Sequence, residues 1–463
     1  MTMLRTISPV DGSVYAERPL AGDSEIGAAL ARSIAAQRDW RRRPLTERAA
    51  LLGAFVDTFV ARRDEIALKL TWQMGRPIRY SPGEIRGFEE RARTMIALAP
   101  QALADVDVGP KDKFRRFVRR DPVGVGLVVA PWNYPYLTAV NSVVPALMAG
   151  NSVLLKHAQQ TPLCSERLVA AASAAGLPDG LLQAIHTSHD ATARLIRNDG
   201  IAHVAFTGSV PGGRAMEEAA IGRFIGVGLE LGGKDPAYVR HDADLDHAVE
   251  NLVDGAFFNS GQSCCGIERI YVHEKLFDGF VEGAAELTQR YVLGDPTSQD
   301  TTLGPMVRTS AADFVRGQIR DAIAAGASAL IDESKFPASR RGTPYLAPQI
   351  LLGVDHRMRV MTEESFGPVV GIMKVKSDEE AITLMNDSEF GLTAAIWTSD
   401  PEAAIAIGDR VETGTWFMNR CDYLDPALSW TGVKNSGRGV TLSTLGYEHL
   451  TQPKSFHLRI ALA

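Results

Sequence analysis

From residue 122 onward, short apolar runs alternate with segments of helical periodicity, and this order constrains the fold more than any other feature. The apolar runs are VGVGLVVAP, NSVLLK, HVAFTG and FIGVGLELGG, and the helix-like segments include PLCSERLVAAASAAG, HDATARLIRN and PGGRAMEEAAI. Strands and helices in alternation build a parallel sheet with crossover helices. The sequence therefore predicts a dinucleotide-type α/β domain, followed after Lys234 by a second α/β block.

The part of the chain before residue 122 has a different character. Residues 23–75 are predicted to be helical, because apolar positions such as Leu52, Phe55 and Phe59 share one helix face. Residues 111–121, KDKFRRFVRRD, are basic with interleaved phenylalanines. This pattern indicates an amphipathic hairpin that packs on a neighbour rather than a site for a polyanion.

Composition excludes several classes of protein. A length of 463 residues suffices for two or three domains, and 49 Lys+Arg against 55 Asp+Glu give no basic excess for a nucleic-acid partner. The 34 uncharged residues between Asp121 and Lys156 could span a membrane, but prolines and asparagines divide them, so we expect a buried core. Four cysteines and the absence of a signal-peptide pattern favour the reducing cytoplasm.

Two residues are candidates for chemistry on a carbonyl. Cys264 lies in FFNSGQSCCGIER among small neighbours, which we expect at a helix start, where a thiolate is favoured and substrate can reach it. Cys264 and Cys265 could instead be buried and inert. Glu230 ends an apolar run directly before two glycines, where burial would raise its pKa toward that of a general base; a surface glutamate is the alternative.

Two turns could bind a ligand. AFTGSVPGG places Gly208 and Gly213 around a turn from a strand into a helix, where backbone N–H groups can meet a phosphate. PWNYP holds Asn133 between two prolines, which fixes its amide as an oxyanion donor requires.

Together these segments resemble the NAD(P)-dependent aldehyde dehydrogenase superfamily. PWNYP, LLK, FTGS, ELGGK, FFNSGQSCC and EESFGPV follow the family's order and spacing, including 34 positions between Glu230 and Cys264. The resemblance runs from about residue 5 to about residue 457. It implies an aldehyde dehydrogenase-like α/β fold with a Rossmann-type cofactor domain (1–105 and 122–232), an α/β catalytic domain (233–447), and a small oligomerisation hairpin and strand (106–121 and 448–463) that make a homodimer or homotetramer.

By this resemblance, Cys264 attacks the aldehyde, Asn133 and the Cys264 N–H hold the oxygen, and Glu230 activates the water that hydrolyses the thioester. The resemblance also assigns Lys156 and Gln159 to the adenosine ribose, Gly208 and Ser209 to the pyrophosphate, and Glu364 and Phe366 to the nicotinamide ribose. Further cofactor contacts are expected at Trp132, Gly213, Leu231 and Gly232. No metal is expected. The cofactor is NAD or NADP, with NAD slightly favoured.

Three departures from the family carry information. Gln159 replaces the usual glutamate three residues after the ribose lysine, which leaves the choice of cofactor open. Asn141 occupies the place where members acting on succinate semialdehyde often have an arginine. KNSGRG at 434–439 lacks the glutamate of the family's C-terminal motif, so a proton relay through that residue is in doubt.

The expected substrate is a medium-sized apolar or aromatic aldehyde. This expectation rests on the tunnel positions that the resemblance assigns: Tyr134, Thr138, Asn141, Ser263, Cys265, Asp422, Tyr423, Leu424 and Trp430. Arg420 could instead serve a semialdehyde, and Asp422 an aminoaldehyde. Glu230 weighs against CoA-acylating chemistry, and no histidine can be placed beside Cys264 for a thiol hydrolase. A structural or binding protein with this fold would have no need of Cys264, Glu230 and Asn133, and all three are present.

Overall fold

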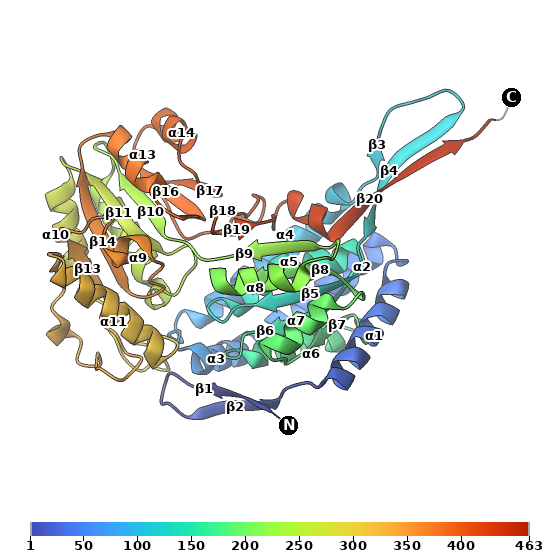
Figure 1. Cartoon of the computed structure of the whole chain (residues 1–463), viewed down its shortest axis with the longest axis horizontal. Coiled ribbons are helices and arrows are strands. Elements are labelled where there is room, and N and C mark those ends of the chain that lie inside the picture. The colour runs from blue at the N-terminus through green and yellow to red at the C-terminus, as the bar shows by residue number, and fades with distance from the viewer. Residues whose placement is uncertain (1, 462–463) are drawn as a thin grey trace.

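The computed structural model describes residues 2–461. Met1, at the start of the predicted cofactor domain, and residues 462–463, at the end of the predicted C-terminal oligomerisation segment, lie outside the described residues. The chain forms two central sheets side by side and a smaller sheet that projects from one end, as Figure 1 shows. Within the described part, no helix combines the length and apolarity that a membrane span requires.

The first central sheet has the strand order β19-β9-β8-β5-β6-β7, parallel except for β19. Its strands are β5 (Val125–Ala130), β6 (Ser152–His157), β7 (Leu182–Ala184), β8 (Ile201–Thr207), β9 (Gly226–Glu230) and β19 (Gly437–Arg438). The connecting helices are α5 (Pro135–Ala149), α6 (Pro162–Ala174), α7 (His189–Arg197) and α8 (Val210–Ala220). The predicted alternation of strand and helix is confirmed, and the uncharged stretch is β5, α5 and β6, all in the core.

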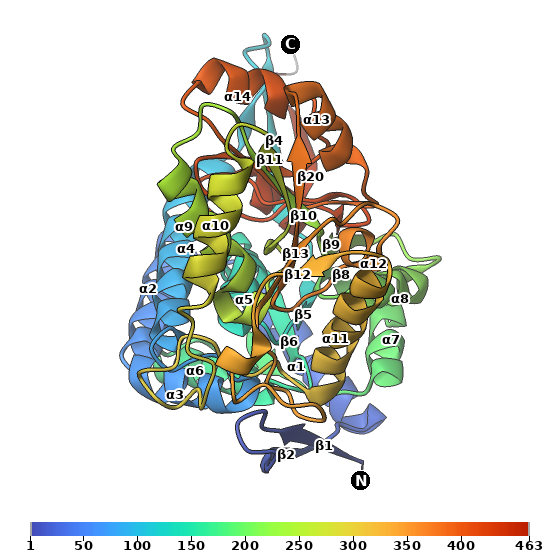
Figure 2. The same cartoon turned by 90° about the vertical axis from the view of Figure 1, so that its left-hand side faces the viewer.

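Helices cover both faces of this sheet because its strands are apolar on both sides. Val128 of β5 packs into one cluster with α2, α4 and α5, and Leu127 packs into another with α1, α7 and α8. Figure 2 shows α2 and α4 on the side opposite α7 and α8. The N-terminal helices are α1 (Asp23–Trp40), α2 (Leu45–Val60), α3 (Arg63–Met74) and α4 (Ser81–Ala102), preceded by a hairpin of β1 (Met3–Ile7) and β2 (Val14–Pro19).

The second central sheet has the order β12-β13-β14-β11-β10-β16-β17, with only β12 antiparallel. Its strands are β10 (Asp235–Val239), β11 (Ile267–His273), β12 (Ser328–Ala329), β13 (Gln349–Leu352), β14 (Val369–Val375), β16 (Thr393–Trp397) and β17 (Thr415–Met418). The helices around it are α9 (Leu245–Phe257), α10 (Phe277–Thr288), α11 (Thr309–Ala324), α12 (Arg359–Thr362), α13 (Asp378–Asn386) and α14 (Pro401–Gly408), with short 3-10 turns at Phe258–Gly261 (η1) and Glu333–Lys335 (η2). A further antiparallel pair consists of β15 (Phe390–Gly391) and β18 (Val433–Lys434). It directly precedes β19, the strand by which the chain rejoins the first sheet.

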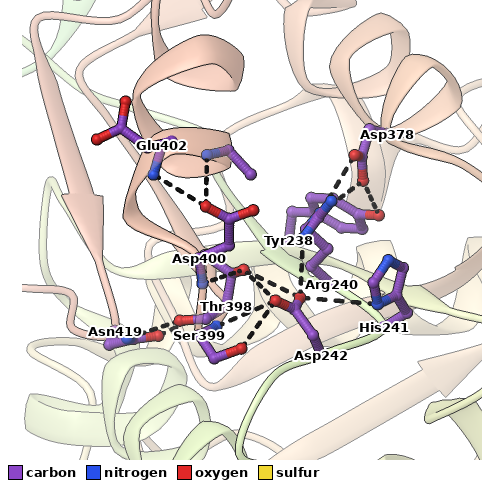
Figure 3. A network of polar contacts seen from close by, with 11 residues as sticks. Tyr238, Arg240, His241, Asp242, Asp378, Thr398, Ser399, Asp400, Glu402 and Asn419 are labelled. Carbon is purple, nitrogen blue, oxygen red and sulfur yellow. Dashed lines mark hydrogen bonds and ion pairs between the residues drawn. The ribbon is translucent and has the colours of Figure 1, made fainter.

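A polar network fixes the carboxyl ends of β10 and β16 (Figure 3). Asp242 accepts hydrogen bonds from the hydroxyls of Thr398 (2.8 Å) and Ser399 (2.9 Å), and Arg240 bridges Asp242 and Asp378 at 3.2 Å each. These groups satisfy one another, and their contacts tie the two strand ends together.

The third sheet is an arm of order β20-β4-β3, and it projects beyond the first sheet (Figure 1). It consists of β3 (Val106–Asp107), β4 (Phe114–Pro122) and β20 (Thr451–Arg459), and the 3-10 turn η3 (Leu445–Leu450) leads into it. The rings of Phe117 and Phe456 stack across β4 and β20 with centroids 4.5 Å apart. The predicted basic hairpin is therefore a sheet whose apolar rings pack on the C-terminal strand.

Candidate active site

A strained turn presents the candidate nucleophile between α9 and β11. Asn259 and Ser260 have left-handed φ angles of 54° and 57°, which non-glycine residues adopt only when their surroundings hold them there. The turn reverses the chain, so that Cys264 lies three residues before β11 begins and is partly exposed. Cys264 is thus not at a helix start, as the sequence suggested, but in a loop between a helix and a strand.

The two neighbouring thiols have different surroundings. Cys265 is 4% exposed, and its Sγ donates a hydrogen bond to Oδ1 of Asp422 at 2.8 Å. The hydroxyl of Ser263 donates to the same oxygen at 3.1 Å. The hydrogen bond with Cys264, burial and the Asp422 charge together raise the pKa of Cys265 well above its usual range. Cys265 is therefore held as a thiol, and Cys264 is the more exposed of the two.

A buried arginine joins the Asn133 segment to the nucleophile segment. Nδ2 of Asn133 donates to the carbonyl of Gln262 at 3.2 Å, two residues before Cys264. Arg76, 2% exposed, donates to the backbone carbonyl of Asn133 and to Oδ1 of Asn259, the latter at 3.2 Å. Arg76 also forms a buried ion pair with Glu84. No motif marks Arg76 or Glu84 in the sequence, because the backbone and amide groups that they bind are distant in the chain.

Glu84 in turn caps the helix that follows Asn133. Its Oε1 accepts hydrogen bonds from the backbone N–H groups of Tyr136 (2.8 Å) and Leu137 (3.4 Å) in the first turn of α5. A carboxylate at a helix N-terminus satisfies free N–H groups and complements the helix dipole. The Arg76–Glu84 pair therefore fixes both the backbone of Asn133 and the start of α5.

Glu230 ends β9 and faces two hydroxyl groups. Thr441 donates to its Oε1 at 2.6 Å, and Thr207 donates to its Oε2 at 3.1 Å. Burial raises the pKa of Glu230, while the two hydroxyls and the charge of Arg91 lower it in part. The segment after Glu230 touches the nucleophile loop, since a Cβ on Gly233 would lie only 2.5 Å from the carbonyl oxygen of Cys264.

Arg91 of α4 is a buried cation near Glu230 and Cys264. No motif in the sequence pointed to Arg91. Its Nη1 donates to the carbonyl of Leu137 at 2.6 Å and to Oδ1 of Asn141 at 3.3 Å. Burial lowers the pKa of Arg91, and the nearby Cys265, Glu230, Glu84 and Cys264 act in the opposite direction. Among residues 2–461, no carboxylate lies within ion-pair distance of Arg91.

The turn predicted to bind phosphate lies at the start of α8, and its glycines are closely packed against neighbouring side chains. A Cβ on Gly208 would lie 2.7 Å from the ring of Phe206, and a Cβ on Gly213 would lie 2.7 Å from the side chain of Leu231. Ser209 is the N-cap of α8 and accepts a hydrogen bond from the N–H of Gly212 at 3.3 Å. Backbone N–H groups at this N-terminus can bind an anion.

The EESFGPV loop lies against the Gly232–Gly233 turn. Oε1 of Glu364 accepts a hydrogen bond from the N–H of Gly233 at 3.1 Å, and burial with the Glu268 charge raises the pKa of Glu364 to about 8. Glu268, paired with Lys234, accepts from the backbone N–H of Phe366 at 2.9 Å. The Phe366 ring meets Trp132 edge-on, with centroids 5.6 Å apart.

Comparison with known proteins identifies the family. The sequence matches the aldehyde dehydrogenase family over residues 1–456. The chain belongs to the aldehyde dehydrogenase family. It is an NAD(P)-dependent oxidoreductase, as the resemblance in sequence implied.

Three similar proteins illustrate the range of this family. A succinate-semialdehyde dehydrogenase (NADP(+)) of Mycolicibacterium paratuberculosis is 34% identical over 98% of this chain and 96% of its own. A 3,6-anhydro-alpha-L-galactose dehydrogenase of Streptomyces coelicolor is 33% identical, with 99% and 94% covered. The structure of an NADP-dependent glyceraldehyde-3-phosphate dehydrogenase from Bacillus halodurans, complexed with NADP, superposes with a TM-score of 0.93 at 33% identity, with 99% and 96% covered.

The residues of this aldehyde dehydrogenase fit a nicotinamide cofactor. Lys156 is 8% exposed, and its ammonium donates only to the His157 carbonyl at 3.4 Å, which leaves donors for a ribose. Burial lowers the pKa of Lys156. Gln159 is exposed, and its Nε2 donates to the Arg5 carbonyl at 3.3 Å, so the N-terminal hairpin packs beside this position.

The predicted tunnel residues of the aldehyde dehydrogenase have unequal surroundings. An open cavity of about 350 Å³ is lined by Glu250, Asn251, Asp254, Gly255, Phe258, Cys421 and Asp422, of which the sequence analysis identified only Asp422. Trp430 is 4% exposed in the core, with Leu424 packed against the same cluster. Tyr423 donates its hydroxyl to Glu90 at 2.9 Å beneath the guanidinium of Arg420. The Thr138 hydroxyl donates to the Tyr134 carbonyl at 2.8 Å.

Proposed function

We propose that this enzyme oxidises an aldehyde to the carboxylic acid through a thioester on Cys264, which water activated by Glu230 hydrolyses. One observation carries the proposal: the accessible thiol of the pair lies in a loop that contacts both the Asn133 amide and the segment that follows Glu230. The four cysteines are free, which supports a cytoplasmic location.

The first step is addition of the Cys264 thiolate to the aldehyde carbon, which leaves an oxyanion. The Asn133 amide has two N–H groups, and one of them is held by the Gln262 carbonyl. The second N–H can point at the oxyanion, together with the backbone N–H of Cys264. Such a donor typically contributes about 3–4 kcal/mol to the transition state.

NAD(P), when bound, supplies the hydride acceptor. Lys156 would hold a ribose, the α8 turn at Gly208 and Ser209 would hold the pyrophosphate, and Glu364 and Phe366 would hold the nicotinamide end. Trp132, Leu231 and Gly232 complete this wall. The chain's own task is to hold Cys264 and Asn133 in fixed positions during the oxidation.

The oxidised carbon remains on Cys264 as a thioester, and Glu230 acts at this stage. Its carboxylate takes a proton from water while the water oxygen attacks the thioester carbon. The C–S bond breaks, the acid leaves, and Cys264 regains its thiolate. Burial supports this role, because a raised pKa makes Glu230 a stronger base.

For the substrate class, Arg91 favours a semialdehyde with a carboxylate at its far end. A buried guanidinium near Cys264 without a carboxylate partner is a ready site for that group. The similar succinate-semialdehyde dehydrogenase supports the same class. A neutral medium-sized aldehyde is the second candidate, because the 350 Å³ cavity has room for it and the carboxylates of Glu250, Asp254 and Asp422 in its wall would repel an anionic substrate.

Stopped-flow measurement of reduced cofactor tests the mechanism. Glu230→Gln should form about one reduced nicotinamide per active site and then stall as thioester. A wild-type steady rate in this variant would remove Glu230 from the mechanism.

A second measurement decides the substrate. Arg91→Gln should raise KM for succinate semialdehyde at least about tenfold, while KM for hexanal and benzaldehyde changes little. Arg93→Gln, an exposed change on the same helix, is the matched control. Higher kcat/KM for hexanal than for succinate semialdehyde in the wild type would favour the second candidate.

A further inference from the structure

The turn that carries Cys264 is held by a single carboxylate. The Gly266 N–H donates to the Ser263 carbonyl at 3.2 Å, so the four residues from Ser263 to Gly266 form a turn with Cys264 at its second position. The side chains on either side of Cys264 converge on one atom, because the Ser263 hydroxyl and the Cys265 thiol both donate to Oδ1 of Asp422, at 3.1 Å and 2.8 Å. Asp422 therefore fixes the residue before the nucleophile and the residue after it.

Asp422 lies in a loop that is tied down on two sides. It follows β17 with a left-handed φ of 51°, a conformation that persists only where the surroundings hold it. Asn419, at the start of this loop, exchanges two hydrogen bonds of 3.0 Å and 2.9 Å with the backbone of Thr398 (Figure 3). A Cβ on Gly255 of α9 would lie only 2.5 Å from Sγ of Cys421, so the loop also packs closely on that helix. The carboxylate thus reaches the nucleophile turn from a fixed position.

The charge on Asp422 depends on its surroundings. The 350 Å³ cavity opens beside it, and Glu250 and Asp254 of α9 line the same cavity. Burial and the Asp254 charge raise the pKa of Asp422 to about 6, while its two hydrogen bonds and the charge of Arg76 act in the opposite direction. The other titratable groups that face Asp422 are the thiols of Cys265 and Cys421 and the hydroxyl of Tyr134. Asp422 is therefore mostly ionised at about pH 7 and mostly neutral at about pH 5.

We propose that Asp422 is a positioning residue for the oxidation and keeps the Cys264 turn in the geometry that attacks the aldehyde. The proposal rests on the function proposed above, in which the Cys264 thiolate adds to the carbonyl carbon. Asp422 acts through Ser263 and Cys265, which differs from the substrate contact that the sequence resemblance assigns to it. The turn also carries the Cys264 N–H that meets the oxyanion, so a displaced turn misplaces the nucleophile and this donor together. A misplacement of about 1 Å can slow a reaction about a hundredfold.

The ionised form of Asp422 holds the turn best. Hydrogen bonds to a charged acceptor are about twice as strong as those to a neutral one, so protonation weakens the contacts with both Ser263 and Cys265. The hold should therefore be strong at neutral pH and weak below the pKa of Asp422.

The first turnover isolates the step that depends on Asp422, because Glu230 acts only after the hydride has left. Asp422→Asn keeps the size of the side chain, an acceptor oxygen and a residue type that tolerates a left-handed φ, but removes the charge. In stopped flow with hexanal, the rate at which reduced cofactor first forms should fall at least about tenfold, while the hexanal concentration that half-saturates this rate changes less than about twofold. Asp422→Ala should lose more, since no acceptor remains. Asp425→Asn, an exposed change further along the same loop, is the matched control.

Two further readouts distinguish positioning from a general effect on the fold. The ratio of the wild-type rate to the Asp422→Asn rate should fall toward one between about pH 8 and about pH 5, because the wild-type carboxylate is itself neutral at the lower pH. Adding Asp422→Asn to the pair Ser263→Ala and Cys265→Ala should slow the first turnover no further, because the two donors through which Asp422 acts are already gone.

The outcomes separate this proposal from the proposed function. Wild-type first-turnover rates in Asp422→Asn and Asp422→Ala would overturn the positioning role while the function stands. A higher half-saturating hexanal concentration at an unchanged maximal rate would also overturn it and would make Asp422 a substrate contact. A rate ratio that stays constant with pH, or a full additional loss in the triple variant, would overturn it as well. If Asp422→Ala does not fold, Asp422→Asn decides alone. If wild-type protein reduces neither NAD nor NADP with any aldehyde, the proposed function itself fails.

Discussion

At the scale of single residues, the CC pair shows how surroundings assign chemistry. Cys264→Ala should abolish turnover and labelling by an aldehyde-mimicking alkylator, because the accessible thiol is lost. Cys265→Ala should keep most activity, since the buried Cys265 thiol is held protonated beside Asp422. Steady-state kinetics and mass spectrometry of the labelled protein measure both effects. Equal loss in the two variants would contradict the assignment.

The charge of Arg91 should be visible in the pH dependence of hydrolysis. Only the Glu230 carboxylate is a base, so kcat should fall as pH falls through the raised pKa of Glu230. Arg91 stabilises that carboxylate, and Arg91→Gln should therefore raise the pKa further and move this acid limb to higher pH. The pH profile of kcat with hexanal measures the shift, with Arg93→Gln as control. A shift to lower pH would show that Arg91 does not act on Glu230.

Position 159 bears on the choice between NAD and NADP. Gln159 carries no charge that would repel a 2′-phosphate, so we expect both cofactors to work with a preference below about a hundredfold (about 2.8 kcal/mol). Gln159→Glu should raise KM for NADP, because like charges 4 Å apart repel by about 4 kcal/mol at an effective dielectric of 20. Gln101→Glu on α4 is a distant control. An unchanged KM for NADP would show that residue 159 does not face the 2′ position.

At the scale of elements, the start of α5 depends on one buried ion pair. Glu84→Gln breaks the pair with Arg76 and weakens the cap on Tyr136, so it should lower the free energy of unfolding by about 3–5 kcal/mol. Glu89→Gln on the same helix loses only an exposed pair with Arg93 and should change stability by less than about 1 kcal/mol. Urea unfolding followed by circular dichroism compares the two. Equal midpoints would show that the pair is not needed.

The elements that the sequence could predict are those whose burial imposes a periodicity. β5 and β6 are buried on both faces and appear as continuous apolar runs. The helices α6 to α8 follow from the helix-like segments between β6 and β9. The hairpin β1–β2 shows no apolar run, because β1 buries only Leu4 and Thr6 of its five residues, and the two-residue strands are too short for a periodicity to appear.

The same difference separates the site residues. Cys264, Glu230 and Asn133 lie in short motifs of neighbouring residues, so the sequence marks them. Arg76 and Arg91 act on Asn133 and Asn141, which are more than forty residues away in the chain, and nothing in the residues next to either arginine marks its partner. The apolar substrate expectation depended on aromatic residues such as Trp430, which packs in the core.

At the scale of the whole molecule, the arm is the candidate contact between subunits. β20 is an edge strand of nine residues, and Leu458 is 44% exposed on it. An exposed edge of this length is a template for pairing with another chain. We propose a homodimer or homotetramer and expect Leu458→Asp to shift it toward monomers in light scattering, because a buried unpaired charge is costly. Leu68→Asp on α3 should not do so, and a monomeric wild type would exclude the proposal.

The position of Arg76 has a consequence for how the enzyme fails under stress. Arg76 joins the loop after β5 of one central sheet to the turn before β11 of the other, so the catalytic groups are aligned only while the two sheets are docked. Sub-global openings have free energies below that of global unfolding, and we expect the separation of the two sheets to be such an opening. In guanidinium chloride, activity should therefore disappear at a lower concentration than helical ellipticity does, and dilution should restore it without refolding from the random coil.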